Sequence, residues 1–221
     1  MKMERVEQVA VIADIVGSRR LPDRAAAQRA LDETIADVDA AVPLARTPLR
    51  PVVGDEQQGL YPTVEAAMAA TLLLRLALPP GLDLRFGIGT GAVETLPGPA
   101  GEIPEGPGWW AAREAIERVH SLQKRNAPHA RTWVVAARDD AEGMSDAVRS
   151  ANAYLLARDH LIGAMSDRGR RLTLGRLYGR SQRDLAESEG ITQSAVSQAL
   201  SSAGAGAIVE GFDVLMPGVR P

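Results

Sequence analysis

The pattern of apolar residues defines the first two elements of the chain. The stretch Val9–Ile15 is apolar apart from Asp14, which is typical of a buried strand. Further on, apolar residues recur at helical spacing and predict a helix over Ala25–Val42, with Asp23 as its N-cap. The chain therefore opens with a strand and a helix.

A hairpin and a second helix follow. The segments Leu49–Val53 and Gln58–Tyr61 are predicted strands, and Gly54-Asp55 between them is a tight turn signal. The segment Val64–Leu78 begins after a capping residue, Thr63, and ends at a proline-rich stop, so it predicts a helix. This helix is apolar nearly all round, which indicates that it is buried on most sides.

The next elements complete the pattern of a sheet. Alternation over Leu82–Gly89 predicts a strand, and Leu96–Gly108, which is rich in glycine and proline, predicts a loop. A helix over Trp109–Arg125 and a strand over Arg131–Ala136 are predicted next. The order begins with the βαββαβ pattern of a ferredoxin-like sheet with its helices on one face, and we predict an α+β fold.

The remainder of the chain has a helical pattern. Ser145–Ser166 predicts a connector helix, and no convincing strand follows before the last segment. We therefore predict a first domain at residues 1–142, a connector at 143–167 and a small helical domain at 168–221. The last segment, Ala207–Leu215, is either a small wing or a final packing element.

Composition restricts the class of protein. A hydrophobic fraction of 45% and a charged fraction of 24% are ordinary for a globular chain. The absence of cysteine excludes disulfides, thiolate metal sites and a cysteine nucleophile, and fits a cytoplasmic location. The longest apolar stretch, Ala66–Leu78, contains Arg75 and is too short to span a bilayer, so no membrane association is expected. The net charge of −3 means that binding of nucleic acid would need a local basic cluster.

Two acidic residues mark candidate metal-binding positions. Asp14 ends the first strand and is followed by the flexible pair Gly17-Ser18 and by Arg19. Asp55 lies in the hairpin turn, which the predicted sheet brings to the same edge as Asp14. Mg²⁺ binds carboxylates together with phosphate oxygens, and open backbone N–H groups bind the phosphate. In the alternative interpretation Asp14 only ends a strand and Asp55 only fills a turn, where aspartate is common.

These motifs are similar to those of a known enzyme class. The stretch 13–18, Ala-Asp-Ile-Val-Gly-Ser, resembles the metal-binding strand and loop of class III nucleotide cyclases. Gly54-Asp55-Glu56 resembles their second metal-binding turn, and also that of the diguanylate cyclases, whose catalytic fold is related. The likeness continues through Leu84–Gly91 and Gly108–Arg113, where Arg113 matches an arginine that serves the ribose and phosphates.

The resemblance implies Mg²⁺ or Mn²⁺ at Asp14 and Asp55, with a purine nucleotide as the ligand. The residues that it implies for the nucleotide are Ile15, Val16, Gly17, Ser18, Arg19, Glu56, Trp109, Trp110 and Arg113. Trp109 stands where cyclases carry an asparagine, and Pro51 where they often carry a base-reading lysine, so we assign no catalytic residue.

Other roles remain open for four of these residues. One of the two tryptophans is expected to pack in the core and the other to contact the ligand, because aromatic side chains serve both uses. Arg113 is alternatively the partner of Glu117, one helical turn away. Glu56 is alternatively a solvated turn residue.

The segment Arg180–Leu200 has the pattern of a helix-turn-helix. Ala186 is small enough for two helices to cross closely, and Gly190 supplies the turn between them. Arginines between Asp167 and Asp184 form a basic run without an intervening acid, which suits phosphate contacts. The predicted DNA-binding residues are Arg180, Gln182, Arg183, Thr192, Gln193, Ser194, Ser197 and Gln198. Alternatively, the motif serves only packing or protein contacts.

The order of all these motifs resembles the SatD family, bacterial proteins that join a cyclase-like region to a C-terminal helix-turn-helix. The resemblance covers residues 8 to 215. We interpret the chain as a transcription regulator that binds a purine nucleotide with Mg²⁺ and acts as a homodimer on double-stranded DNA. The alternatives are a metal-dependent nucleotidyl cyclase or nucleotide phosphohydrolase, and a DNA-binding protein whose first domain has lost its ligand.

Overall fold

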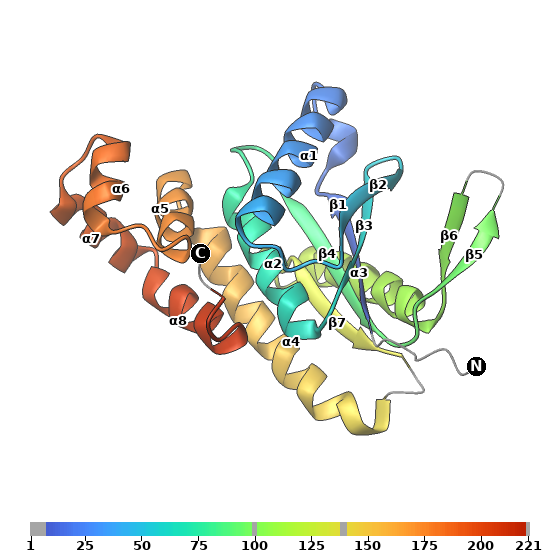
Figure 1. Cartoon of the computed structure of the whole chain (residues 1–221). Coiled ribbons are helices and arrows are strands. Elements are labelled where there is room, and N and C mark those ends of the chain that lie inside the picture. Colours follow the sequence, from blue (N-terminus) through green and yellow to red (C-terminus); the bar gives the residue numbers. More distant parts are fainter. Residues whose placement is uncertain (1–7, 99–100, 138–140, 220–221) are drawn as a thin grey trace.

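A five-stranded sheet forms the centre of the protein. The computed structural model describes residues 8–98, 101–137 and 141–219. The strands of this sheet are β1 (Val9–Ile15), β2 (Thr47–Val53), β3 (Glu56–Tyr61), β4 (Leu84–Thr90) and β7 (Thr132–Ala136). They lie in the order β2-β3-β1-β4-β7, and only the β4–β7 pair is parallel (Figure 1).

The first four strands have the arrangement of a ferredoxin-like sheet, as the sequence predicts. Strand β1 lies between β3 and β4, and it is antiparallel to both. The register pairs Asp14 with Glu56 of β3 on one side and with Arg85 of β4 on the other. The edge strand β2 is irregular, with two register shifts against β3 and prolines at positions 48 and 51.

Helices cover both faces of the sheet, so the prediction of helices on one face was wrong. The four helices concerned are α1 (Arg24–Ala41), α2 (Val64–Ala77), α3 (Pro107–Arg125) and α4 (Ala141–Ala164). Val11 and Ile15 pack in one core with α1, α2 and α4, whereas Ala10 and Ile12 pack in another with α3. The reason is visible in β1 itself, because its apolar residues point alternately to the two faces and both sets are buried.

Two glycines of β4 allow α3 to lie close to the sheet. A Cβ atom at Gly87 would lie 2.1 Å from the carbonyl oxygen of Ala112, and one at Gly89 would lie 2.1 Å from that of Gly108. Neither separation is possible for real atoms, so any side chain at these positions would move the helix. The close approach therefore depends on glycine.

The segment predicted as a loop before α3 contains a small hairpin. Its strands are β5 (Glu94–Gly98) and β6 (Gly101–Glu105), which pair with each other and stand apart from the main sheet (Figure 1). Glycine and proline suggested a loop because both are uncommon inside strands, but in a two-stranded ribbon they are tolerated. The helix predicted from Trp109 begins two residues earlier, at Pro107, and ends at Arg125 as predicted.

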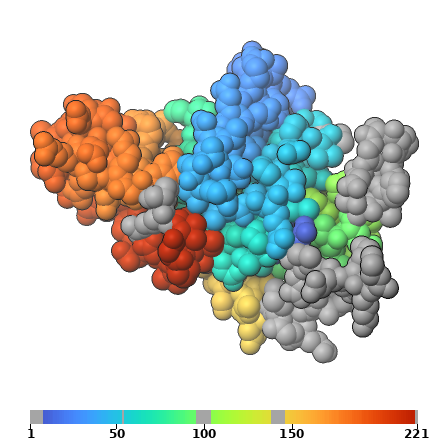
Figure 2. Space-filling model, viewed as in Figure 1, coloured from blue at the N-terminus to red at the C-terminus, as the bar shows by residue number. Residues whose placement is uncertain are grey.

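Four helices form a lobe at the C-terminal end of the chain. They are α5 (Asp167–Leu177), α6 (Gln182–Glu189), α7 (Gln193–Ser202) and α8 (Ala205–Leu215). Its α6–α7 part, orange in Figure 2, projects from the body of the protein. Helix α8 replaces the wing considered from the sequence, since Ile208 and Phe212 are buried in the main core and hold it there as a packing element.

A buried charge network joins α4 to the sheet. Arg158 and Asp159 of α4 and Arg75 of α2 are almost completely buried. The Asp159 carboxylate accepts hydrogen bonds from the guanidiniums of both arginines and from the backbone N–H groups of Arg131 and Thr132. Helix α4, predicted as a connector, is therefore tied to α2 and to the start of β7 by charged hydrogen bonds.

Among the helices of the described residues, none is long and apolar enough to cross a lipid bilayer.

Candidate functional site

The acidic residues predicted from the sequence meet where β1 ends and β3 begins. Asp14 is the penultimate residue of β1, and its cross-strand partner is Glu56, the first residue of β3. Asp55 immediately precedes Glu56 in the turn between β2 and β3. Because Asp14 and Glu56 are directly paired, their side chains project from the same face of the sheet, the face that α3 covers.

Asp14 is held by an arginine that sequence reasoning missed. Arg85, its partner on β4, donates from Nε to one carboxylate oxygen at 2.8 Å and from Nη2 to the other at 2.9 Å. The third guanidinium nitrogen donates to the amide oxygen of Gln123 on α3 at 3.3 Å. A polar residue at an alternating position of an apolar strand was the available signal, since it faces the same side as Asp14.

Glu56 is held in the same way by Arg113 of α3. The two guanidinium nitrogens donate to the two carboxylate oxygens at 2.6 and 2.7 Å. Arg113 thus pairs with Glu56, and not with Glu117, which was the alternative considered from the sequence. Burial raises the pKa of Glu56, but hydrogen bonds from Arg113 and Gln58 outweigh this and hold the pKa below its usual value. The hydrogen bonds to Glu56 raise the pKa of Arg113.

A cavity of about 250 Å³ lies beside this acidic end. Gly17 adopts a left-handed conformation that turns the chain from β1 into a short 3-10 helix, η1 (Ser18–Arg20), at the cavity wall. The cavity is lined by Ile15, Ser18, Leu21, Arg24, Ala25, Gln28, Gly54 and Asp55. It therefore combines one carboxylate, one guanidinium, a hydroxyl and an amide with apolar side chains. Arg24 and Gln28, from the start of α1, were not anticipated.

The remaining predicted nucleotide-binding residues lie elsewhere. Val16 continues the backbone beyond β1 and donates its N–H to the carbonyl of Asp83, and Arg19 is exposed in η1. Trp109 is only 8% exposed and packs on Ala10 and Ile12, so it is the packing tryptophan of the pair. Trp110 is 62% exposed and donates its indole N–H to Glu105 at 2.9 Å. Trp110 therefore remains the candidate for a ligand contact.

The acidic end has donor atoms that suit Mg²⁺ or Mn²⁺. Carboxylate oxygens of Asp14, Asp55 and Glu56 are hard ligands, and such ions bind through one or two carboxylates together with phosphate and water. No group of three or more His, Asp or Glu side chains in the described ranges is arranged to hold a metal ion on its own. A divalent ion here would therefore take its remaining ligands from a bound phosphate and from water.

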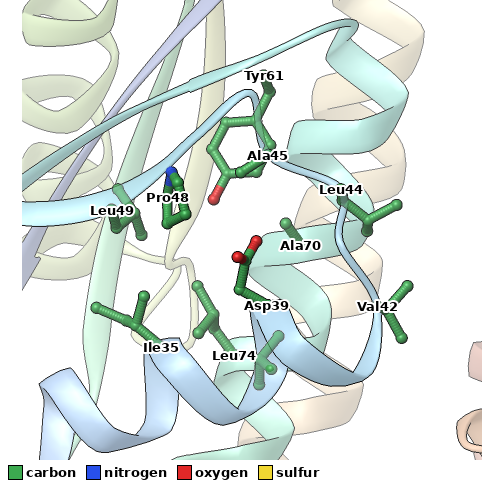
Figure 3. A pocket seen from close by; sticks show the side chains of 11 residues that line it. Ile35, Asp39, Val42, Leu44, Ala45, Pro48, Leu49, Tyr61, Ala70 and Leu74 are labelled. Atoms are coloured by element: carbon green, nitrogen blue, oxygen red, sulfur yellow. The ribbon is translucent and has the colours of Figure 1, made fainter.

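A second cavity, between α1 and the β2–β3 hairpin, is too small for a nucleotide. Its volume is about 20 Å³, close to the space that one water molecule needs. Figure 3 shows the Asp39 carboxylate and the Tyr61 hydroxyl directed into it among apolar side chains. Burial, and then the charge of Asp39, raise the pKa of Tyr61. The larger cavity beside Asp55 is the better ligand site.

In the C-terminal lobe, α6 and α7 are two capped helices joined by a turn. Ser181 and Asp184 form a reciprocal capping box at the start of α6, and Gly190 ends that helix in a left-handed conformation. Thr192 caps α7 by accepting a hydrogen bond from the N–H of Ala195. Buried side chains fix the crossing of the two helices; they include Leu185, Ala186, Val196 and Leu200.

Most of the predicted DNA-binding side chains are exposed on this lobe. On α7 the exposed residues are Gln193, Ser194, Ser197 and Gln198, and Thr192 is exposed just before them. Arg180 and Arg183 are exposed, and Gln182 is half-buried as the first residue of α6. Part of the basic run is neutralised, because Glu189 accepts two hydrogen bonds of 2.8 Å from Arg171 and lies 3.6 Å from Arg168. The sequence spacing did not predict this contact between α5 and α6.

These features define a mixed α+β protein with a ferredoxin-like sheet, an acidic strand end beside a cavity, and a C-terminal helical lobe. A model of the SatD family matches residues 8–209. The chain therefore belongs to the SatD family, as the resemblance of its motifs indicated.

Several solved structures are similar to part of this chain. An adenylate cyclase from Trypanosoma brucei in its monomeric state shares 17% identity, with 54% of this chain and 71% of that chain covered and a TM-score of 0.43. A bacterial light-regulated adenylyl cyclase shares 16% identity with a TM-score of 0.42; 58% of this chain is covered, but only 43% of the cyclase chain. A dimeric guanylyl cyclase domain from Blastocladiella emersonii shares 16% identity over 50% of this chain and 74% of that chain, with a TM-score of 0.39.

Likenesses at these identities and TM-scores assign no activity to this chain. A search among curated proteins gave no match.

Proposed function

We propose that this protein is a nucleotide-responsive transcription regulator. It binds a purine nucleotide with Mg²⁺ or Mn²⁺ where β1 and β3 meet, and this binding controls the attachment of α6 and α7 to double-stranded DNA. The observation that carries the first half is the placement of three carboxylates at one end of the sheet. Asp14 and Glu56 are cross-strand partners on the face that α3 covers, and Asp55, next to Glu56, lines a cavity of about 250 Å³. Carboxylates suit a metal ion that also binds phosphate oxygens.

The second half rests on the exposed polar face of α7. Gln193, Ser197 and their neighbours are exposed, while Val196 and Leu200 anchor the opposite face of the helix in the lobe. Glutamine reads adenine with two hydrogen bonds and serine contacts base edges or phosphates, so this face suits the major groove. The exposed guanidiniums of Arg180 and Arg183 supply cations for the phosphate backbone.

Helix α1 offers a physical link between the two sites. Its first turns carry Arg24 and Gln28 into the wall of the larger cavity. Further along, its Asp37 lies close enough to Tyr178, the residue that ends α5, to contribute with burial to a raised Tyr178 pKa. A ligand that shifts α1 would therefore act on the lobe, provided that the ligand binds the two arrangements with different affinities.

The regulator is expected to act as a homodimer. Two copies of α7 related by a two-fold axis would read the two halves of a palindromic operator. A change in the relative position of the two copies on ligand binding would then alter the spacing of the two recognition helices.

Calorimetric titration with ATP and with GTP, each with and without Mg²⁺, tests the nucleotide site. We expect metal-dependent binding of at least one nucleotide, and its loss in Asp14→Asn and Asp55→Asn. The matched control is Asp146→Asn, which removes an exposed carboxylate paired with Arg149 on α4. Equal affinity in all four proteins would refute the assignment.

Enzymatic turnover is the rival interpretation, since in-line phosphoryl or nucleotidyl chemistry uses the same kinds of metal ligand. Incubation with each nucleoside triphosphate and Mg²⁺ or Mn²⁺, followed by chromatography, distinguishes the two. Release of cyclic nucleotide or phosphate over many turnovers would make the protein an enzyme. Selection of bound duplexes from a random-sequence pool, with and without the nucleotide, tests the DNA-binding half separately.

A further inference from the structure

Four charged side chains form two neighbouring ion pairs where β1 meets β3 and β4. Asp14 is the cross-strand partner of both Glu56 and Arg85, and Arg113 reaches Glu56 from α3. Like charges placed directly opposite each other in an antiparallel pair are destabilising. Here each carboxylate has its own guanidinium, so the set is electrically neutral and the repulsion between Asp14 and Glu56 is offset.

Every oxygen of the two carboxylates already accepts a hydrogen bond. Arg85 occupies both oxygens of Asp14, and Arg113 occupies both oxygens of Glu56, at distances from 2.6 to 2.9 Å. A metal ion that binds these oxygens must therefore compete with the guanidiniums. A free metal ion would also leave the displaced guanidiniums without their carboxylate partners, next to a new positive charge, which is unfavourable electrostatically.

A metal ion that binds together with phosphate avoids this electrostatic cost, because the phosphate provides new partners for the guanidiniums. The fork of a guanidinium matches a phosphate as well as it matches a carboxylate. The acids can then move to the metal ion while the arginines move to phosphate oxygens, and every charge keeps a partner. Gln123 accepts the remaining hydrogen bond from Arg85 and would keep that guanidinium oriented during the exchange.

We propose that Arg85 and Arg113 are exchangeable partners of Asp14 and Glu56, and that the ligand is a divalent metal ion complexed with a polyphosphate chain. The exchange favours binding of metal and polyphosphate together over binding of either one alone. The inference rests on the proposed nucleotide site and adds Arg85 to it as a phosphate-binding residue. Because binding free energies are linked, metal and polyphosphate each raise the affinity for the other.

Electron paramagnetic resonance of free Mn²⁺ tests this exchange with the full-length protein and no nucleotide. We expect weak Mn²⁺ binding in the unaltered protein and binding tighter by about tenfold in Arg85→Gln and in Arg113→Gln, because each removes the competing guanidinium. The Arg113 side chain is 47% exposed, against 12% for Arg85, so its variant keeps the test valid if Arg85→Gln is poorly folded. The matched control is Arg118→Gln on the same helix, whose guanidinium lies 6.0 Å from the ring of Trp133.

The second measurement is calorimetric titration with inorganic triphosphate in the presence of Mg²⁺. Both arginine variants should bind the complex more weakly than the unaltered protein, while Arg118→Gln should bind it equally well. Unchanged Mn²⁺ affinity in both variants, with nucleotide binding intact in the unaltered protein, would overturn the exchange and leave the proposed function standing. Absence of metal-nucleotide binding in the unaltered protein would overturn both.

Discussion

Asp159 of α4 accepts a 2.7 Å hydrogen bond from Arg75 of α2, and the exposed fractions of the two side chains are only 0% and 4%. The residues are far apart in the sequence, so this contact forms only when α2 and α4 pack on the same face of the sheet. Arg158 completes the cluster with hydrogen bonds to Thr132 and to the Met68 carbonyl. Removal of the single carboxylate would leave two buried guanidiniums without their counter-charge.

Asp159→Asn should therefore be strongly destabilising. Loss of one partner of a buried ion pair typically costs about 3–5 kcal/mol, because the remaining charge stays desolvated. Urea unfolding followed by circular dichroism measures the free energy of unfolding. In the control Asp146→Asn, which breaks an exposed pair, the change should be at most about 1 kcal/mol. Similar values for the two variants would show that the network contributes little.

The same carboxylate predicts resistance to mild acid. Burial raises the pKa of Asp159, but the charges of Arg158 and Arg75 and its hydrogen bonds outweigh this and lower the pKa below the ordinary value of 3.8. A lowered pKa means that the stabilisation is complete above pH 3.8 and is lost progressively as the pH falls from 3.8 to the lower pKa of the folded state. Thermal unfolding between pH 3 and pH 7 should thus show a smaller pH dependence in Asp159→Asn than in the unaltered protein at the acid end.

Substitution of the two glycines of β4 should separate α3 from the sheet. Gly87→Ala and Gly89→Ala place a Cβ atom where backbone atoms of α3 already lie, and overpacking of this kind costs about 1–3 kcal/mol or more. Gly206→Ala in α8 is the control, because no atom of the described part of the chain lies within 4 Å of its new Cβ atom. Alanine there should be neutral or stabilising by about 0.5–1 kcal/mol. Unfolding midpoints in urea give the comparison.

If α7 contacts the DNA bases, substitutions on its exposed face should reduce sequence-specific binding, whereas loss of a nearby arginine should weaken binding to any sequence. Gln193→Ala and Ser197→Ala should each reduce discrimination between the selected duplex and a scrambled one, by about 1–3 kcal/mol for a bidentate contact. Arg183→Ala should instead weaken both duplexes equally and reduce the salt dependence by about one unit of slope. Fluorescence anisotropy across a range of salt concentrations measures both quantities. An equal loss for both duplexes in every variant would exclude base reading by α7.

Glu189 should lower the affinity of the lobe for DNA, because its negative charge neutralises nearby arginines. Hydrogen bonds from Arg171 lower the pKa of Glu189, so it is charged at neutral pH and neutralises cations of α5. Glu189→Gln should strengthen binding to any duplex and steepen its salt dependence, because Arg168 and Arg171 become available to phosphates. Glu187→Gln, an exposed change on the same helix, is the control. Unchanged anisotropy curves would show that these arginines lie away from the DNA.

Local patterns in the sequence were sufficient to predict the central sheet. The apolar run of β1, the turn signal at Gly54-Asp55 and the helical spacing in α1 each depend on nearby residues, and their predicted bounds agree closely with the structure. The hairpin β5–β6 was missed because its glycines and prolines are unfavourable in most strands. The helices on the second face of the sheet were not predicted, because an apolar strand does not reveal which helix covers each of its sides.

Contacts between distant residues could not be predicted in the same way. Asp14 was predicted as a site residue, but its ion-pair partner Arg85 can be identified only when the register of β1 and β4 is known. Arg113 was predicted as a site residue too, yet helical spacing suggested Glu117 as its partner, whereas the structure has Glu56. Arg158 and Asp159 resemble a solvated helix face in the sequence, and only the packing of α4 on the sheet explains their burial.

The irregular edge strand β2 has a consequence for how two copies could associate. Pro48 and Pro51 have no N–H group to offer to a neighbouring chain, and the register shifts in this strand bend it away from a regular ladder. An additional strand could not form a continuous row of hydrogen bonds there. A homodimer is therefore not expected to form by strand pairing at β2, and the protein is protected from uncontrolled growth of its sheet into aggregates at this edge.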